Sequence, residues 1–265
     1  TSRFKLYGDG NNIKNELLNG ALTYPFVQKS RTAGYDGRGV AIINNEKDLE
    51  EKLLPGASVV EDLVDIKKEL AVIVARNESG EVQAFPAVEM EFHPTANLVE
   101  FLSCPADITP EIEREAEALA KRVIEAYDIC GLLAVELFLT NNGELLVNEV
   151  APRPHNSGHH TIESCYTSQF EQHLRSVLNL PLGSTKLKSA AIMVNLLGAE
   201  GHTGPAFYDG LDQCLAIEGA HPHIYGKAVT KPFRKMGHVT VLGETVVAAR
   251  KKAKQVEEVL RVNSR

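Results

Sequence analysis

The sequence contains no tryptophan and few cysteines, and aromatic residues make up only 6% of it. The cysteines are Cys104, Cys130, Cys165 and Cys214, and their spacing gives no CxxC unit, which argues against a zinc ribbon or a thioredoxin-type site. We interpret them as free thiols in a reducing compartment. A nucleophilic Cys165 beside the neighbouring histidines is the sharper alternative, but no base at a supporting spacing singles it out.

Long apolar runs and an excess of positive charge are also missing. No stretch of about 18 apolar residues is present, which predicts a protein without a transmembrane helix. The N-terminus has no basic segment followed by an apolar one, so we expect no signal peptide and a cytoplasmic location. The formal net charge of −7 argues against nonspecific binding to nucleic acid. With 43% hydrophobic and 24% charged residues, the composition is typical of a soluble globular protein.

The order of apolar segments predicts an α+β fold with a larger body over residues 1–180 and a small β-rich C-terminal module over 181–265. The linker between them is the PLGS segment at 181–184. In the body, we expect strands over 57–64 and 69–76, and a further strand over 82–91.

Three segments are expected to be helical. The first opens at Thr109-Pro110, with threonine as N-cap and proline at the first helical position. The others cover residues 161–178 and, near the C-terminus, 244–261. The last carries several basic residues, including Arg250, which we interpret as a solvated face.

Two apolar strands, over 131–138 and 144–150, flank the turn sequence TNNGE. A two-residue Asn-Gly turn at 142–143 would pair Asn141 with Glu144, and the same register pairs Glu136 with Glu149. Like charges at such paired positions repel, and a cation between them removes the repulsion. Carboxylate oxygens are the ligands that Mg²⁺ takes beside nucleotide phosphates. Asn148 could add an amide oxygen, although strand alternation places it on the opposite face. The alternative is that both carboxylates point to solvent.

The segment KSRTAGYDGRG, residues 29–39, contains glycines that let backbone N–H groups approach an anion closely. Lys29, at the end of the preceding strand, could place its ammonium on a phosphate. The segment matches neither a Walker A motif nor a GxGxxG helix start, so a plain turn remains an alternative. A phosphate-binding loop together with a carboxylate pair is more specific than either alone.

Directly after Glu149, the stretch APRPHNSGHH concentrates polar side chains in one loop. His155 and His159 have the spacing of a helical zinc pair, but Pro152 and Pro154 argue against a helix there. We therefore interpret the stretch as a polar loop at the mouth of a metal–nucleotide site. Its arginine can bind a carboxylate-like anion through two hydrogen bonds. A structural loop with satisfied side chains is the alternative.

The glycine loop, the Glu136/Glu149 pair and NEVAPRPHNSGHHT together resemble the ATP-grasp superfamily. Within it they resemble the N5-carboxyaminoimidazole ribonucleotide synthase family, as do TSQFEQHLR at 167–175, YGK at 225–227 and RKMGHVTV at 234–241. The resemblance implies an ATP-grasp fold and an ATP-dependent carbon–nitrogen ligase of purine biosynthesis. It would carboxylate 5-aminoimidazole ribonucleotide with bicarbonate through carboxyphosphate, use ATP and Mg²⁺, and form a homodimer without nucleic-acid or membrane partners.

The resemblance also implies roles for individual residues. The ATP phosphates would contact Lys29 and the loop residues Gly34, Tyr35, Asp36, Gly37, Arg38 and Gly39, with Tyr35 and Asp36 closing over the acceptor. Adenine and ribose would be bound by Glu61, Asp62, Leu63, Val64 and Glu69. Glu136 and Glu149 would hold Mg²⁺, with Asn148 beside them. Arg153, His155, Asn156 and Ser157 would be catalytic and would face bicarbonate and the ribonucleotide, whose phosphate would be held by Lys227, Arg234 and Lys235.

Two features depart from the family pattern. Members begin with a Rossmann-like domain, whereas this sequence starts just inside the ATP-grasp region. The family has a histidine near the nucleotide where this sequence has Phe92, with His93 one position later. The alternatives that remain are another ATP-grasp ligase and a nucleotide-binding remnant that acts as a regulatory or subunit-interaction module.

Overall fold

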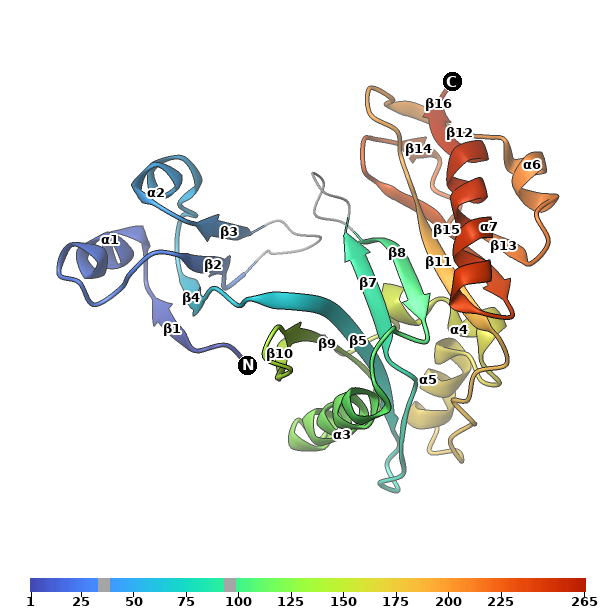
Figure 1. The fold of residues 1–265 in the computed structure, drawn as a ribbon, viewed down its shortest axis with the longest axis horizontal. Coiled ribbons are helices and arrows are strands. Elements are labelled where there is room, and N and C mark those ends of the chain that lie inside the picture. Colours follow the sequence, from blue (N-terminus) through green and yellow to red (C-terminus); the bar gives the residue numbers. More distant parts are fainter. Residues whose placement is uncertain (33–38, 93–98) are drawn as a thin grey trace.

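The computed structural model describes residues 1–32, 39–92 and 99–265. The N-terminal part of the chain forms a small four-stranded sheet. The strand order is β1-β4-β2-β3, formed by β1 (Phe4–Tyr7), β4 (Ser58–Asp62), β2 (Phe26–Ser30) and β3 (Val40–Ile43). Helices α1 (Gly10–Leu18) and α2 (Glu46–Lys52) lie beside this sheet (Figure 1). Ile13, Phe26 and Ile43 form the centre of its core.

A nine-stranded sheet forms most of the remaining structure, with the order β10-β9-β5-β7-β8-β11-β15-β13 and β6 paired with β5. Its strands are β5 (Ile66–Arg76), β6 (Val82–Ala84), β7 (Val88–Phe92), β8 (Val99–Cys104), β9 (Gly131–Thr140), β10 (Leu145–Ala151), β11 (Ala190–Leu197), β13 (Ala220–Ile224) and β15 (Lys235–Gly243). The pairings within it are antiparallel. This sheet continues from the body into the C-terminal module through the pairing of β8 with β11.

Strand alternation gives the sheet two different faces at β5 and β9. Leu70 and Val72 of β5, with Val135 and Leu137 of β9, belong to the cluster that packs on α3 (Pro110–Ala126). Residues one position away face the other side, where Ile73, Ala75, Leu132 and Ala134 form a second cluster with Cys165. The same face carries Glu69 and Glu136 toward the other end of these strands, because they are in phase with this set. One face therefore forms core, and the other forms core at one end of these strands and carries two carboxylates at the other.

The C-terminal module packs α7 (Val246–Val259) against β11 and β15. A three-stranded sheet in the order β14-β12-β16 lies in the same module, made by β12 (Gly204–Asp209), β14 (Val229–Thr230) and β16 (Arg261–Ser264). The short helix α6 (Leu211–Leu215) contacts α7 and β13. Figure 1 shows this module at the opposite end of the molecule from the N-terminal sheet.

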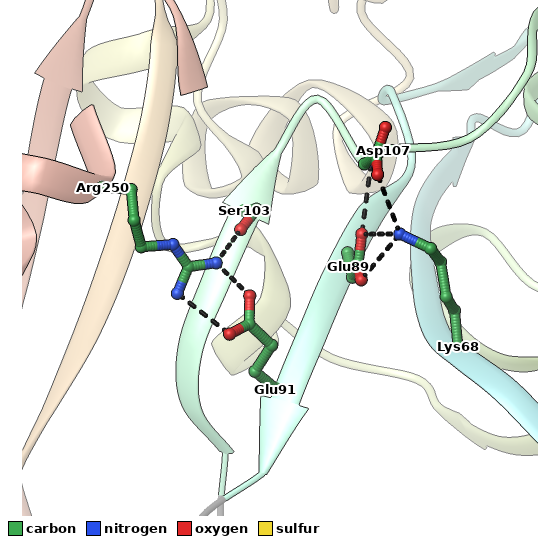
Figure 2. A network of polar contacts seen from close by, with 6 residues as sticks. All are labelled: Lys68, Glu89, Glu91, Ser103, Asp107 and Arg250. Atoms are coloured by element: carbon green, nitrogen blue, oxygen red, sulfur yellow. Dashed lines mark hydrogen bonds and ion pairs between the residues drawn. The ribbon is translucent and has the colours of Figure 1, made fainter. Parts of the chain in front are cut away.

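The interpretation of the α7 basic residues as solvated is wrong for Arg250. Its guanidinium donates to both carboxylate oxygens of Glu91 on β7, at 3.0 Å for the Nη1–Oε2 contact, and to Ser103 Oγ on β8 at 2.8 Å (Figure 2). It also lies 4.9 Å from the ring centroid of Phe101. Arg250 thus ties α7 to two strands of the large sheet.

Most segments expected from the sequence are confirmed within a few residues, including the helix that opens at Thr109-Pro110. Thr109 Oγ1 accepts from Ile112 N, and the buried stripe of this helix is Ala116, Ala120 and Ile124. The α+β fold class is confirmed. The domain boundary at 180 stays a prediction. Among the described residues, no helix combines the length and apolar character needed to cross a membrane.

Two expected segments are each broken in the structure. The single helix over 161–178 is wrong, because Cys165 is extended and bridges to Leu187, and Ser168 caps a new helix. The result is α4 (Thr161–Ser164) followed by α5 (Gln169–Val177). The single strand over 82–91 is also wrong. It divides into β6 and β7 around Pro86, which has no N–H to offer a neighbouring strand.

Candidate functional site

The β9–β10 hairpin pairs Glu136 with Glu149, as the sequence predicts, but by a different route. Thr140, not Asn141, pairs with Glu144, so the two-residue turn is wrong and the loop is one residue longer. A β-bulge between Val147 and Glu149 then restores the expected pairing. Asn148 is the extra residue at the bulge, so simple alternation does not fix the direction of its side chain.

Three carboxylates lie on one face of the large sheet, each from a different strand. Glu136 pairs with Glu149 on β10 and with Ala71 on β5, and Glu69 lies two residues from Ala71 on the same face. Burial raises the pKa of Glu136 to about 8, with further contributions from Glu149 and Glu69, while Lys235 and Lys29 act in the opposite direction. Burial also raises the pKa of Glu69. This concentration of negative charge favours a bound cation.

Lys29 connects the N-terminal sheet to the acidic row, the name used here for Glu69, Glu136 and Glu149. Its ammonium donates to Asn148 Oδ1 at 2.9 Å and lies 2.9 Å from Glu61 Oε2. Ser2 Oγ donates to the same Glu61 oxygen at 2.9 Å. The strand β2 therefore brings a cation to the rim of the acidic hairpin, where an incoming phosphate could replace these partners.

The proposed adenine-binding segment lies where the N-terminal sheet passes into the large sheet. Glu61 and Asp62 are the last residues of β4, and Leu63 and Val64 connect them to β5. Asp62, Leu63, Val64 and Asp65 line a recess with Ala21, Leu22, Thr23, Tyr24 and Pro25. A second recess on this segment is lined by Asp62, Val64 and Asp65 together with Thr1, Ser2, Arg3 and the β9–β10 turn.

The polar loop after β10 reaches the acidic row through His155. Its Nε2 lies 3.6 Å from Glu136 Oε1, and its Nδ1 lies 2.9 Å from Ser157 Oγ. Asn156 exchanges two side-chain hydrogen bonds with Asn195 on β11, at 2.8 and 3.1 Å. Arg153 is exposed, and its Nη1 donates to the carbonyl of Pro154 at 3.2 Å. Of the residues predicted from this loop, His155 is therefore the one with a contact to Glu136.

The three basic residues expected to hold the ribonucleotide phosphate lie on two neighbouring segments. The Lys227 ammonium donates to the carbonyl of Lys235 and lies 5.6 Å from the ring centroid of Tyr225. The positive charge of Lys235 lowers the pKa of both Glu136 and His159, so this lysine is close to the acidic row and to the polar loop. Arg234 is exposed, and its Nη1 donates to the carbonyl of Val229 at 2.7 Å.

A stack of imidazoles behind the polar loop has no counterpart in the sequence predictions. The rings of His159 and His223 each stack on the ring of His238, with centroid distances of 4.7 and 4.5 Å. Burial lowers the pKa of His159 to about 4 and that of His238 to about 3. Tyr225 Oη lies 3.0 Å from His238 Nδ1, and His223 Nε2 lies 2.7 Å from Glu163 Oε1. The stack joins the loop to β13 and β15.

Several predicted residues have no described position or no described role at the site. Gly34, Tyr35, Asp36, Gly37, Arg38 and His93 lie outside the described residues. Gly39 follows directly and has a φ of +82°, a conformation that glycine adopts without strain. Phe92 ends β7. Cys165 is buried with its pKa raised to about 11, which disfavours the nucleophilic thiolate.

Family models match most of the chain. The ATP-grasp domain matches residues 1–170, and the phosphoribosylaminoimidazole carboxylase C-terminal domain matches residues 191–252. The chain is similar to N5-carboxyaminoimidazole ribonucleotide synthase of Bacillus subtilis, with 44% identity over 235 residues, which are 86% of this chain and 60% of the relative. The corresponding protein of Synechococcus elongatus is 38% identical over 245 residues, 91% of this chain and 60% of the relative. The chain thus spans about 60% of the length of these relatives.

Solved structures agree with this similarity. N5-carboxyaminoimidazole ribonucleotide synthetase from Thermotoga maritima has a TM-score of 0.88 and 46% identity, covering 100% of this chain and 68% of that chain. The Aspergillus clavatus synthase, in complex with ADP and 5-aminoimidazole ribonucleotide, has a TM-score of 0.86 and 30% identity, covering 97% of this chain and 68% of that chain.

Proposed function

Because the chain belongs to the N5-carboxyaminoimidazole ribonucleotide synthase family of ATP-grasp proteins, we propose that it joins bicarbonate to 5-aminoimidazole ribonucleotide at the expense of ATP. The products are N5-carboxyaminoimidazole ribonucleotide, ADP and phosphate. The observation that carries the proposal is the contact between the acidic row and the polar loop, where His155 Nε2 lies 3.6 Å from Glu136 Oε1. An intermediate that forms at the acidic row would therefore lie close to the loop that holds its acceptor.

The residues at the acidic row fit a divalent cation. Glu136 and Glu149 face each other across the hairpin, and the raised pKa of Glu136 reflects the cost of two nearby negative charges with burial. We propose that these two carboxylates hold Mg²⁺, with the Asn148 amide oxygen beside them. Bound there, Mg²⁺ would neutralise charge on the transferring phosphoryl group.

The N-terminal sheet and the hinge provide the proposed nucleotide site. Lys29 would exchange Asn148 and Glu61 for an ATP phosphate, because its ammonium already lies between the two segments. The segment from Glu61 to Val64 would hold adenine through its backbone groups, and Glu69 would bind ribose. The loop residues Gly34, Tyr35, Asp36, Gly37, Arg38 and Gly39 would contact the phosphates.

The chemistry has two steps. A bicarbonate oxygen attacks the γ-phosphorus of ATP, which forms carboxyphosphate as ADP leaves. The carbon then passes to the exocyclic amine of the ribonucleotide, the bond between carbon and the bridging oxygen breaks, and the amine loses a proton. Arg153 would stabilise the carboxylate, and His155 would orient bicarbonate or receive the amine proton.

The remaining residues of the polar loop and the C-terminal module would hold the acceptor. Asn156 and Ser157 would fix oxygens of bicarbonate or the ribonucleotide. The phosphate of the ribonucleotide would be bound by Lys227, Arg234 and Lys235. The position of Lys235 close to Glu136 supports this assignment. We further propose a homodimer in a reducing, cytoplasmic environment, and the free cysteines support the reducing environment.

The test is ADP release from Mg-ATP by this chain, with bicarbonate and 5-aminoimidazole ribonucleotide added separately and together. The proposal predicts release that depends on both. If ATP binds without turnover, the chain is joined to the N-terminal domain of the family and the assay is repeated. Restored, ribonucleotide-dependent turnover supports the ligase, whereas tight ATP binding without turnover in both forms indicates a nucleotide-binding module.

A further inference from the structure

Three fully buried glutamines make the same kind of contact with a distant segment. In each, the side-chain amide donates to the backbone carbonyl of one residue while the side-chain oxygen accepts from the N–H of that same residue. Gln28 holds Leu54 in this way, at 3.0 and 2.9 Å, and Gln172 holds Gly183, at 3.0 and 2.8 Å. Gln169 is the third, and the structure places its partner in the polar loop of the site.

Gln169 contacts two residues of that loop, His155 and His159. Its Oε1 accepts from His155 N at 2.9 Å, and its Nε2 donates to the carbonyl of His155 at 2.8 Å. Nε2 also lies 2.9 Å from Nδ1 of His159. Because an amide nitrogen can only donate, His159 Nδ1 is the acceptor, which requires an imidazole without a proton on that nitrogen. The low pKa of His159, about 4, agrees with this neutral ring.

The loop is shaped to accept this side chain. A Cβ built on Gly158 would lie 2.5 Å from Gln169 Oε1 and 2.6 Å from its Cδ, so the amide packs directly on the glycine backbone. Thr161 Oγ1 accepts from Gln169 N at 2.8 Å and donates to the carbonyl of Gly158 at 2.6 Å. The start of α5 and the loop are therefore locked together at several points.

We propose that Gln169 is a positioning residue for the ligase reaction, which holds His155 in place beside Glu136 and His159 in place against the stacked histidines. This inference rests on the proposed function and adds a residue that acts through the loop without touching substrate. The His155 ring spans from Ser157 Oγ to Glu136 Oε1, so a shift of its backbone moves its Nε2 relative to the acidic row. Small displacements of a group that assists chemistry reduce turnover strongly.

Gln172 supplies a matched control. It lies on the same helix and is equally buried, and its amide makes the same two backbone contacts, but its partner Gly183 lies in the 181–184 segment and not in the site loop. Gln169→Met and Gln172→Met keep side-chain length and remove these hydrogen bonds in each case. Both should lower the unfolding temperature, because each leaves one backbone N–H without its partner, that of His155 in one variant and that of Gly183 in the other.

Turnover separates the two variants. We expect Gln169→Met to lower kcat by about 100-fold with the KM for ATP unchanged, and Gln172→Met to stay within about threefold of the parent chain. Equal losses in both variants, or an unchanged kcat in Gln169→Met, would overturn the proposal. Gln169→Glu is the second variant should methionine prevent folding. It keeps an acceptor for His155 N but has no donor, and we expect it also to lower kcat.

A spectroscopic measurement keeps this inference separate from the proposed function. In ¹⁵N-labelled chain, the ring-nitrogen shifts of His159 report its tautomer, and hydrogen exchange of the His155 amide reports the contact with Gln169. Gln169→Met or Gln169→Glu should alter both signals, and Gln172→Met should alter neither. Unchanged His155 and His159 signals in the Gln169 variants would overturn the positioning role, whatever the chain does with ATP.

Discussion

Lys29 donates a hydrogen bond to Asn148 across 119 residues of sequence, at 2.9 Å from Nζ to Oδ1. The contact joins β2 of the N-terminal sheet to the bulge in β10, next to the acidic residue Glu149. The bulge adds one residue to β10 beside the paired carboxylates, and that residue is Asn148. A cation from one sheet and two carboxylates from the other thus meet at one place.

Removing this cation should weaken nucleotide binding. We expect Lys29→Met to raise the Kd for Mg-ATP by about 10- to 100-fold, since a charged hydrogen bond contributes about 1.5–3 kcal/mol. Lys47→Met is the control, because that lysine is exposed on α2 of the same domain and pairs only loosely with Glu51, at 3.9 Å. Calorimetric titration measures both. Equal affinities in the two variants would contradict the role of Lys29.

Glu149→Gln should abolish Mg-ATP turnover while leaving the fold intact, because Glu149 is exposed and its charge serves the cation. The same change should lower the pKa of Glu136, since the Glu149 charge is one of the causes that raise it. Glu144→Gln, at an exposed position of the same hairpin, is the control and should retain activity. Unchanged turnover in Glu149→Gln would rule out the assignment of Glu149 to the metal.

The titration of Glu136 predicts a pH dependence of stability in the metal-free chain. Its pKa rises from 4.5 to about 8 on folding, so the folded state binds more protons between these pH values. The free energy of unfolding should therefore fall as pH rises from about 5 to about 8. Glu136→Gln should remove this part of the slope, and Glu144→Gln should not. Denaturant unfolding at a series of pH values measures it, and identical slopes in the parent chain and Glu136→Gln would show the prediction to be wrong.

Metal binding should have the opposite pH dependence. A cation at the acidic row needs both carboxylates ionised, so the affinity for Mg-ATP should increase as pH rises toward about 8. Proton release on binding, measured in buffers of different ionisation enthalpy, should be largest below that pH.

Arg250 is expected to hold the C-terminal helix to the large sheet. Arg250→Met should lower the free energy of unfolding by about 1–2 kcal/mol, a modest value because Glu91 is partly exposed. Lys251→Met, at the exposed neighbouring position, should change it by less than about 0.5 kcal/mol. Chemical denaturation of both variants provides the comparison, and equal stabilities would contradict the anchoring role.

Much of the fold could be predicted because strands and capped helices leave local patterns in the sequence. The pairing of Glu136 with Glu149 was predicted from two apolar strands and a two-residue turn. The loop is one residue longer than predicted, and the bulge at Asn148 compensates for this. Alternation along the strands predicts neither change. A β-bulge depends on the partner strand, and the sequence of one strand does not specify it. The break between α4 and α5 was hidden for a similar reason, because Cys165 leaves the helix to bridge with Leu187.

The contacts that support the polar loop were beyond sequence reasoning. In the sequence, Gln169 looks like an ordinary polar residue of a helix. It is buried against His155 only because α5 packs against the loop. The stacked histidines likewise come from distant segments, with His159 in the loop and His238 on β15. The concentration of polar residues after Glu149 was the one available indication in the sequence. It predicted the polar loop but not the residues that support it, such as Gln169 and His238.

The most direct measurement follows oxygen from bicarbonate to phosphate during turnover with Mg-ATP and 5-aminoimidazole ribonucleotide. If the γ-phosphoryl group passes to bicarbonate, ¹⁸O-labelled bicarbonate gives inorganic phosphate that carries one ¹⁸O atom per molecule released, detected by the isotope shift in ³¹P NMR. Turnover that yields unlabelled phosphate would mean that water or another oxygen attacks ATP, and it would contradict the central claim that this site phosphorylates bicarbonate.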